Sequence, residues 1–427
     1  MRNQTAERML AFIEKSPTPY QAVENLREML AGAGFTEVSE TDDWQAENGL
    51  PKKFFVTRNG SALMAVKLPE KGMPRGFHIA AAHCDSPAFR VKENPEMLSE
   101  GCYTRLNTEK YGGMILSTWL DRPLSVAGRI VADTEEGMKA IPVNVDRDLC
   151  VIPNLAIHMN RGMNDGFAYN PQTDMLPLFG SETASKDGFL KTVAEAAGVA
   201  PEDILAHDLF LYTRQPGTFV GAGDEYVVSP RLDDLQCVFS AAEGFLAADP
   251  AEYVNICAVF DNEEVGSGTK QGADSTFLSD VLARVAESYG LCESEYERLV
   301  AGSFLISADN GHAVHPAHPE KADPTNRPHP NGGIVIKYHG AQKYTTDGVS
   351  AARMKKICRK AGVPFQIYTN RSDIVGGSTL GNISASHVSV NSVDIGLAQL
   401  AMHSAVETAG AEDTEYAVKA FTVFFGE

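Results

Sequence analysis

The chain has 427 residues, 43% of them apolar and 22% charged, and its formal net charge is −19. This length exceeds the usual size of one hydrophobic core, so we expect two domains or one domain with a large insertion. The acidity argues against binding to nucleic-acid phosphates and to anionic membrane surfaces, and it is typical of a cytoplasmic enzyme.

The first part of the chain predicts two helices followed by three strands. Residues 4–15 form a helical pattern that Ser16-Pro17-Thr18-Pro19 breaks, and Thr18 is placed to cap a second helix over residues 20–30. No continuous apolar stretch opens the chain and no run of about 18 apolar residues exists, so we expect neither a signal peptide nor a membrane span. The strands are expected at residues 54–57, 62–68 and 76–83.

The middle of the chain, residues 95–226, has a different texture. It is rich in Gly, Pro and Asn and contains few long helical patterns. The predicted elements are short strands at residues 114–117 and 128–131 and a helix over residues 188–198 that begins near Thr183 or Ser185. We interpret this section as a mostly β insertion or a separate module.

From about residue 227 the pattern alternates between strands and helices. This alternation predicts an α/β fold with a mixed, mostly parallel sheet and helices on both faces. The predicted helices cover residues 231–248, 277–289 and 349–361, with a terminal helix from Ser404, and the predicted strands cover residues 253–260, 303–307, 333–337 and 364–369.

The seven cysteines are dispersed and include no C-x-x-C pair. An odd, scattered set argues against a disulfide framework and against a cluster of thiolate metal ligands. Any metal should therefore be held by His and carboxylates. The cysteines are Cys84, Cys102, Cys150, Cys237, Cys257, Cys292 and Cys358.

Acids and histidines occur at five places near predicted strand ends. His83 and Asp85 are two residues apart, so on an extended strand they share a face. His83 could bind a metal through one ring nitrogen while an acid accepts the N–H of the other. For this pair taken alone, a structural explanation is favoured. Asp233 and Asp234 open a predicted helix, where complementing the helix dipole explains acids as readily as metal binding does.

Glu263 and Glu264 give the sharpest local signal because they follow an apolar strand directly. Ligands in open α/β sheets sit outside the carboxyl ends of the strands. Two consecutive glutamates can divide the work, since one can bind metal while the other acts as general base on the attacking water. The alternative is a solvated loop.

Asp309 also follows a predicted strand, and His403 precedes the predicted terminal helix. Each of these residues taken alone has a structural explanation, and that explanation is favoured for His403. His312, His315 and His318 follow Asp309 among Pro and Gly residues, and a metal role is disfavoured for each of them.

The combination suits two zinc ions that share one carboxylate. Two imidazoles and three carboxylates provide the donors that a pair of such ions uses. Two metals polarise a carbonyl and lower the pKa of a bridging water, and Glu263 could carry the water's proton to the leaving amine. The candidate ligands are His83, Asp233, Glu264, Asp309 and His403.

Over nearly its whole length the sequence resembles the aspartyl aminopeptidases, a family of dinuclear zinc metallo-aminopeptidases. The segments that carry the resemblance are 16–20 (SPTPY), 82–92 (AHCDSPAFRVK), 119–129 (WLDRPLSVAGR), 152–161 (IPNLAIHMNR), 229–235 (SPRLDDL), 260–267 (FDNEEVGS), 307–316 (SADNGHAVHP), 332–337 (GGIVIK) and 400–410 (LAMHSAVETAG). Their joint occurrence in this order is highly specific.

The resemblance implies roles for individual residues. It implies the five candidate ligands with Asp233 bridging, Glu263 as general base, and Asp85 as the residue that orients His83. It further implies that His158 reaches into the site of a neighbouring subunit and steadies the tetrahedral intermediate. Lys337 and Tyr344 are expected to line the substrate pocket, where a lysine could receive an acidic side chain.

The resemblance also implies an architecture. Residues 1–94 and 227–427 would form the zinc-peptidase-like catalytic domain, and residues 95–226 the inserted dimerisation domain. The expected assembly is a homo-oligomer, a dodecamer built from dimers, which admits only short peptides. Two Zn²⁺ per subunit are expected, and Co or Mn also accept such ligands.

The sequence departs from the family near the pocket, and two other activities remain alternatives. The family pattern S-D-x-P-C-G-S-T-I-G-P stands here as SDIVGGSTLGN at residues 372–382, without its Pro and Cys, which leaves the preference for Asp or Glu substrates a hypothesis. A related co-catalytic metal deacylase would use the same ligand types. An inactive assembly or cargo protein would keep the fold alone, and the intact Glu263–Glu264 pair argues against it.

Overall fold

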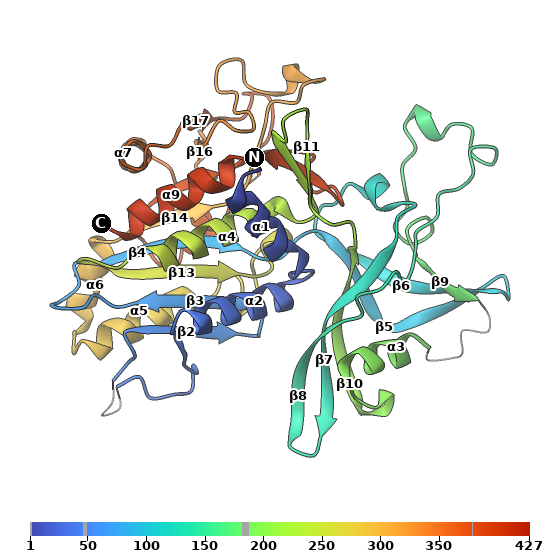
Figure 1. Cartoon of the computed structure of the whole chain (residues 1–427), viewed down its shortest axis with the longest axis horizontal. Helices are drawn as coiled ribbons and strands as arrows, with labels where there is room; N and C mark the ends of the chain where they lie inside the picture. Colours follow the sequence, from blue (N-terminus) through green and yellow to red (C-terminus); the bar gives the residue numbers. More distant parts are fainter. Residues whose placement is uncertain (1, 46–48, 182–187, 378) are drawn as a thin grey trace.

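The computed structural model describes residues 2–45, 49–181, 188–377 and 379–427. Within these residues the chain forms a mixed α/β structure with three sheets (Figure 1). The central sheet has nine strands, in the spatial order β1 Thr36–Glu37, β2 Lys53–Arg58, β3 Ala62–Lys67, β13 Val254–Phe260, β4 Phe77–His83, β14 Phe304–Ala308, β18 Asn391–Gly396, β16 Ile334–Lys337 and β17 Phe365–Tyr368.

Most neighbouring strands of the central sheet run parallel, which confirms the predicted mixed, mostly parallel sheet. The core of the sheet is a parallel set in which β13, β14 and β18 run in the same direction as β4. Antiparallel pairs occur at β2–β3, β3–β13 and β16–β18. Because β4, β13 and β14 are parallel, the residues that follow their carboxyl ends meet at one edge of the sheet.

Helices cover both faces of the central sheet, so its middle strands are buried on both sides. Every residue of β4 and β13 is buried, which explains their near-continuous apolar sequences. One face packs against α1 Gln4–Glu14, α2 Pro19–Gly32, α4 Leu232–Ala247, α7 Gly348–Ala361 and α9 Asp413–Phe425. The other packs against α5 Phe277–Ser288, α6 Glu293–Ala301 and α8 Leu380–Ser384.

A six-stranded sheet with its own apolar core lies to one side of these layers (Figure 1). Helix α3 Gly188–Ala197 packs into this core through Phe189 and Val193. The strands, in spatial order, are β8 Gly137–Asn144, β7 Leu124–Thr134, β10 Ile204–Thr213, β5 Ala88–Ser99, β6 Tyr103–Tyr111 and β9 Leu178–Ser181. This agrees with the mostly β character expected of the middle section.

A five-stranded sheet connects distant parts of the chain. Its order is β11 Thr218–Val220, β12 Tyr226–Ser229, β20 Glu407–Gly410, β19 Ala398–Leu400 and β15 Gly311–His312. Strands β5 and β12 extend across the expected domain limits at residues 94 and 227. The division into a catalytic and a dimerisation domain stays a prediction.

Two predicted elements differ from the structure. Residues 114–117 are not a strand, because Met114 and Trp119 both turn into the core of the six-stranded sheet and Leu116–Trp119 forms a short 3₁₀ helix. The terminal helix begins at Asp413 rather than at Ser404, because residues 407–410 pair with β12 and β19.

Two capping predictions concern helix starts. Thr18 occupies the position before α2, but its hydroxyl contacts the Gln21 side chain and caps no helix N–H. The predicted starts at Thr183 and Ser185 lie outside the described residues. Among the helices that are described, none has the length and apolar character needed to cross a membrane.

Candidate metal centre

The candidate ligands come together where three parallel strands of the central sheet end. β4 ends at His83, which is paired in register with Phe260 at the end of β13. Glu263 and Glu264 lie in the short turn after β13, and Asp309 follows β14 directly. Helix α4 approaches the same edge with its first turn and brings Asp233.

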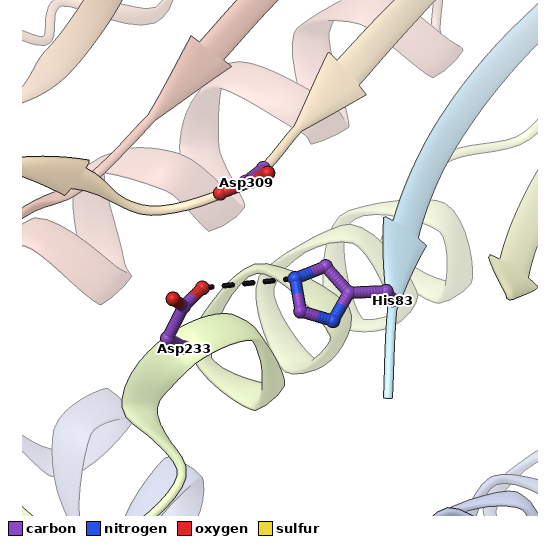
Figure 2. A group of neighbouring side chains, drawn as sticks. All are labelled: His83, Asp233 and Asp309. Atoms are coloured by element: carbon purple, nitrogen blue, oxygen red, sulfur yellow. Dashed lines mark ion pairs between the residues drawn. The ribbon is translucent and has the colours of Figure 1, made fainter. Parts of the chain in front are cut away.

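His83, Asp233 and Asp309 form the first group (Figure 2). All three side chains are buried, and one possible ligand atom from each lies within 4.8 Å of the others. His83 Nε2 is 3.7 Å from Asp233 Oδ1. Figure 2 shows the His83 ring extending from the end of β4 toward the Asp233 carboxylate.

Asp233 also belongs to a second group, with Glu264 and His403. His403 Nε2 lies 3.5 Å from Asp233 Oδ2 and 3.4 Å from Glu264 Oε2. The two oxygens of Asp233 therefore face two different histidines, His83 and His403. This is the arrangement that a carboxylate bridging two cations requires.

Both groups suit cations because each contains a buried carboxylate oxygen without a hydrogen-bond partner within the described residues. Asp233 Oδ1 and Glu264 Oε1 are buried and accept no hydrogen bond there. Burial and the charge of Asp233 raise the pKa of Glu264 well above its ordinary value. Burial alone would lower the pKa of His403, but Asp233 and Glu264 raise it to about 10. Such a concentration of negative charge, with His and carboxylate donors only, fits divalent zinc.

Asp85 connects the first histidine to the glutamate pair. Its Oδ1 lies 3.3 Å from His83 Nδ1, the ring nitrogen that faces away from Asp233. Asp85 also accepts the main-chain N–H groups of Glu263 and Glu264, both at 3.1 Å. Tyr111 donates its hydroxyl to Asp85 Oδ2 at 2.7 Å. Asp85 thus holds the His83 ring and the Glu263–Glu264 turn in fixed relative positions.

Glu263 forms a third possible group with His83 and Glu264, and its pKa is perturbed. Burial raises its pKa to about 7, and the nearby carboxylates of Asp309 and Asp85 act in the same direction. A carboxyl with a pKa near neutrality can both accept and return a proton at physiological pH.

Two further buried carboxylates, Asp234 and Glu407, have functions that the sequence did not reveal. Asp234 accepts the main-chain N–H groups of His83 at 3.3 Å and of Asn310 at 3.2 Å. Glu407 accepts those of Asp233 at 3.0 Å and of His403 at 2.8 Å. In the sequence, Asp234 directly follows Asp233, and Glu407 lies four residues after His403. Neither position identifies the main-chain N–H groups that these carboxylates accept.

Lys337 and Tyr344 lie next to the first group rather than lining an open surface. Lys337 is 2% exposed, and its Nζ lies 3.4 Å from Asp309 Oδ1 and 2.9 Å from the Asn310 carbonyl. The ammonium is 5.6 Å from the centre of the Tyr344 ring. The Lys337 ammonium therefore already neutralises Asp309, a candidate ligand. An acidic group of a substrate would have to share this ammonium with Asp309.

His158 is exposed in the segment between β8 and β9, and it belongs to none of these groups. Its expected role in the site of a neighbouring subunit stays a prediction. His312, His315 and His318 are not members of these groups. His315 packs against His318 with ring centres 5.3 Å apart.

Comparisons with known proteins show the family of the chain. Residues 12–425 match the family described as aminopeptidase I zinc metalloprotease (M18). The chain is 47% identical to a probable M18 family aminopeptidase 2 of Clostridium acetobutylicum, over 98% of each chain.

Solved structures of other proteins are similar to this chain over nearly its whole length. The chain superposes on Ape4, from a complex of Ape4 and Nbr1, with a TM-score of 0.95 and 36% identity, covering 99% of this chain and 85% of the other. The mApe1 dodecamer of Saccharomyces cerevisiae gives a TM-score of 0.86 at 28% identity, covering 98% and 96% of the two chains.

Proposed function

The chain belongs to the M18 family of zinc metalloproteases and is a zinc-dependent aminopeptidase, and from this premise we propose the details of its reaction. It removes single residues from the N-termini of short peptides by a mechanism that uses two zinc ions. The observation that supports two ions is the Asp233 carboxylate, whose oxygens face His83 and His403 at 3.7 and 3.5 Å.

The assignment of residues to each ion is supported by two of the groups of neighbouring side chains. His83 and Asp309 complete one set with Asp233, and Glu264 and His403 complete the other. When bound, the ions supply Lewis acidity that polarises the scissile carbonyl and lowers the pKa of water. Co or Mn could replace zinc, because the donors are nitrogen and oxygen only.

Glu263 moves the proton. With a pKa near 7, its carboxylate takes a proton from the attacking water and returns it to the amine that leaves. Asp85 supports this step because it fixes the main chain of Glu263 while it orients the His83 ring. In the assembled protein, His158 of a second copy steadies the tetrahedral intermediate.

Substrate preference is assigned to the region around Lys337 and Tyr344, with acidic N-terminal residues as the favoured class. The support is the buried ammonium beside the first ligand group. Its contact with Asp309 limits how much charge it offers to a substrate, so a preference for neutral residues is the alternative outcome.

The assembly is a homo-oligomer, a dodecamer built from dimers, with residues 95–226 as the dimerisation domain. Its support is the dodecameric structural relative and the exposed apolar side chains Leu155, Ile157 and Met159, which flank His158. A cytoplasmic location is supported by the cysteines, all seven of which are free.

The test is hydrolysis of Asp-, Glu-, Leu- and Met-terminated chromogenic amides by the zinc-loaded protein and by its Glu263→Gln variant. We expect activity on at least one amide to fall by several orders of magnitude in Glu263→Gln while zinc content is unchanged. Glu297→Gln makes the same chemical change on exposed helix α6 and should behave as wild type. Lys337→Ala, if it left Asp- and Leu-amide hydrolysis equally unchanged, would refute the acidic preference.

Two other outcomes would redirect the assignment. Activity on N-blocked peptides alone would indicate the related metal deacylase. No turnover of any amide, with both metals bound, would indicate an inactive assembly protein.

A further inference from the structure

Glu407 occupies the junction of two segments that carry candidate ligands. It is the first residue of β20, where it pairs in register with Ser229 at the end of β12. Four residues after Ser229, the chain brings in Asp233 at the start of α4. Four residues before Glu407 lies His403. The register of this one strand pair thus places a buried carboxylate between Asp233 and His403.

The hydrogen bonds of Glu407 distinguish it from a ligand. Oε2 accepts the Asp233 main-chain N–H at 3.0 Å, and Oε1 accepts that of His403 at 2.8 Å. Oε1 also lies 3.4 Å from Gln399 Nε2. Both oxygens are therefore engaged, whereas Asp233 Oδ1 and Glu264 Oε1 have no hydrogen-bond partner among the described residues. Glu407 is 2% exposed, so its contacts are shielded from bulk solvent.

His403 needs such support because its backbone is strained. Its φ is +66°, in the left-handed region that non-glycine residues rarely adopt. Strain of this kind persists only where the surrounding structure fixes the conformation. The N–H bond to Glu407 and the contact of His403 Nδ1 with the Gly113 carbonyl at 2.9 Å are two such constraints.

The first ligand group has a separate anchor. Asp234 accepts the main-chain N–H groups of His83 and of Asn310, which neighbours Asp309. Ser86 Oγ donates to the Asp233 carbonyl at 2.9 Å, so the main chain of Asp233 keeps a second attachment without Glu407. The loss of Glu407 should therefore affect His403 more than the ligands of the first group.

We propose that Glu407 is a positioning residue that holds His403 in register with Asp233 and so sets the affinity of the second metal position, formed by Asp233, Glu264 and His403. This inference rests on the proposed two-metal site. Residues that orient ligands from behind typically contribute a factor of about 10 to 100 in metal affinity or activity.

The test compares the binding of Co²⁺ to three metal-free proteins: wild type, Glu407→Gln and Asp413→Asn. Binding is measured by calorimetry and by the visible absorption of the bound cobalt. Asp413 is the matched control, because it is a buried carboxylate that accepts two main-chain N–H groups, from Asn331 at 2.7 Å and Gly333 at 2.9 Å, and belongs to neither ligand group. Glu407→Asp, which keeps the charge but is one methylene too short to reach both amides, serves if Glu407→Gln does not fold.

Wild type should bind two ions per chain. Glu407→Gln should keep the affinity of the first metal position and weaken that of the second about 10- to 100-fold. Hydrolysis by this variant should be restored as the metal concentration rises. Asp413→Asn should keep both affinities. Equal affinities in Glu407→Gln and wild type, an equal loss at both positions, or the same selective loss in Asp413→Asn would overturn the inference. A single ion in wild type would refute the proposed two-metal site as well.

Discussion

Lys67 in β3 provides a stability prediction that can be worked out from its contacts. It is 2% exposed, and its Nζ donates to the main-chain carbonyls of Phe245, Leu246 and Ala248 at 2.8, 3.1 and 2.6 Å. These carbonyls belong to the last turn of α4, whose C-terminal carbonyls have no partner within the helix. The ammonium therefore caps the helix that carries Asp233 at its other end.

The magnitude follows from two opposing contributions. Hydrogen bonds to a charged group contribute about 1.5–3 kcal/mol each. Burial lowers the pKa of Lys67 to about 8, so the side chain remains an ammonium at pH 7. That shift corresponds to a desolvation cost of about 3 kcal/mol. Three such bonds exceed this cost by about 2–6 kcal/mol. We therefore expect Lys67→Met, which keeps the length of the side chain but removes the three donors, to lower the free energy of unfolding by about 2–6 kcal/mol.

Lys53 is the matched control for this measurement. It pairs in register with Lys67 on the neighbouring strand but is exposed. Lys53→Met should therefore change stability by no more than about 0.5 kcal/mol. The assay is equilibrium urea unfolding of the zinc-loaded protein at pH 7, followed by tryptophan fluorescence. If Lys67→Met unfolded within about 0.5 kcal/mol of Lys53→Met, the three carbonyl contacts would contribute no net stability and the reasoning would be refuted.

Two other predictions concern a buried histidine and the support of Asp85. Burial and the nearby Arg353 guanidinium lower the pKa of His78 to about 3, below its ordinary value of 6.5. The unfolded chain then binds more protons than the folded chain between these values, so stability is lost as pH falls below 6.5. From pH 7 to 4.5, wild type should lose about 3 kcal/mol more than His78→Phe in urea unfolding, and equal losses would contradict the assignment. Tyr111→Phe removes the hydroxyl that donates to Asp85, and we expect about a tenfold fall in kcat/KM at full zinc occupancy. A kcat/KM equal to that of wild type would show that Asp85 is positioned without Tyr111.

The sequence determined which residues could hold metal because the relevant signals are local. An apolar run followed at once by His or an acid predicts a buried strand with a ligand at its carboxyl end. His83, Glu264 and Asp309 all lie at such positions in the structure. The alternation of strands and helices predicted the mixed sheet in the same way, since strand and helix periods are readable within a short window.

Only the tertiary structure decided how these residues face one another. The division of Asp233 between two histidines depends on the approach of α4 to three strand ends, which no local pattern specifies. Residues 407–410 form a strand instead of a helix because β12 and β19 offer main-chain partners there.

The same pairing explains why Glu407 was missed. Its function depends on hydrogen bonds to main-chain N–H groups, which every residue except proline possesses and which leave no trace in residue identity. Ligands can be predicted from the type of side chain, because zinc selects imidazole and carboxylate donors. A carboxylate that holds a backbone in place is identified only when the fold brings the two together.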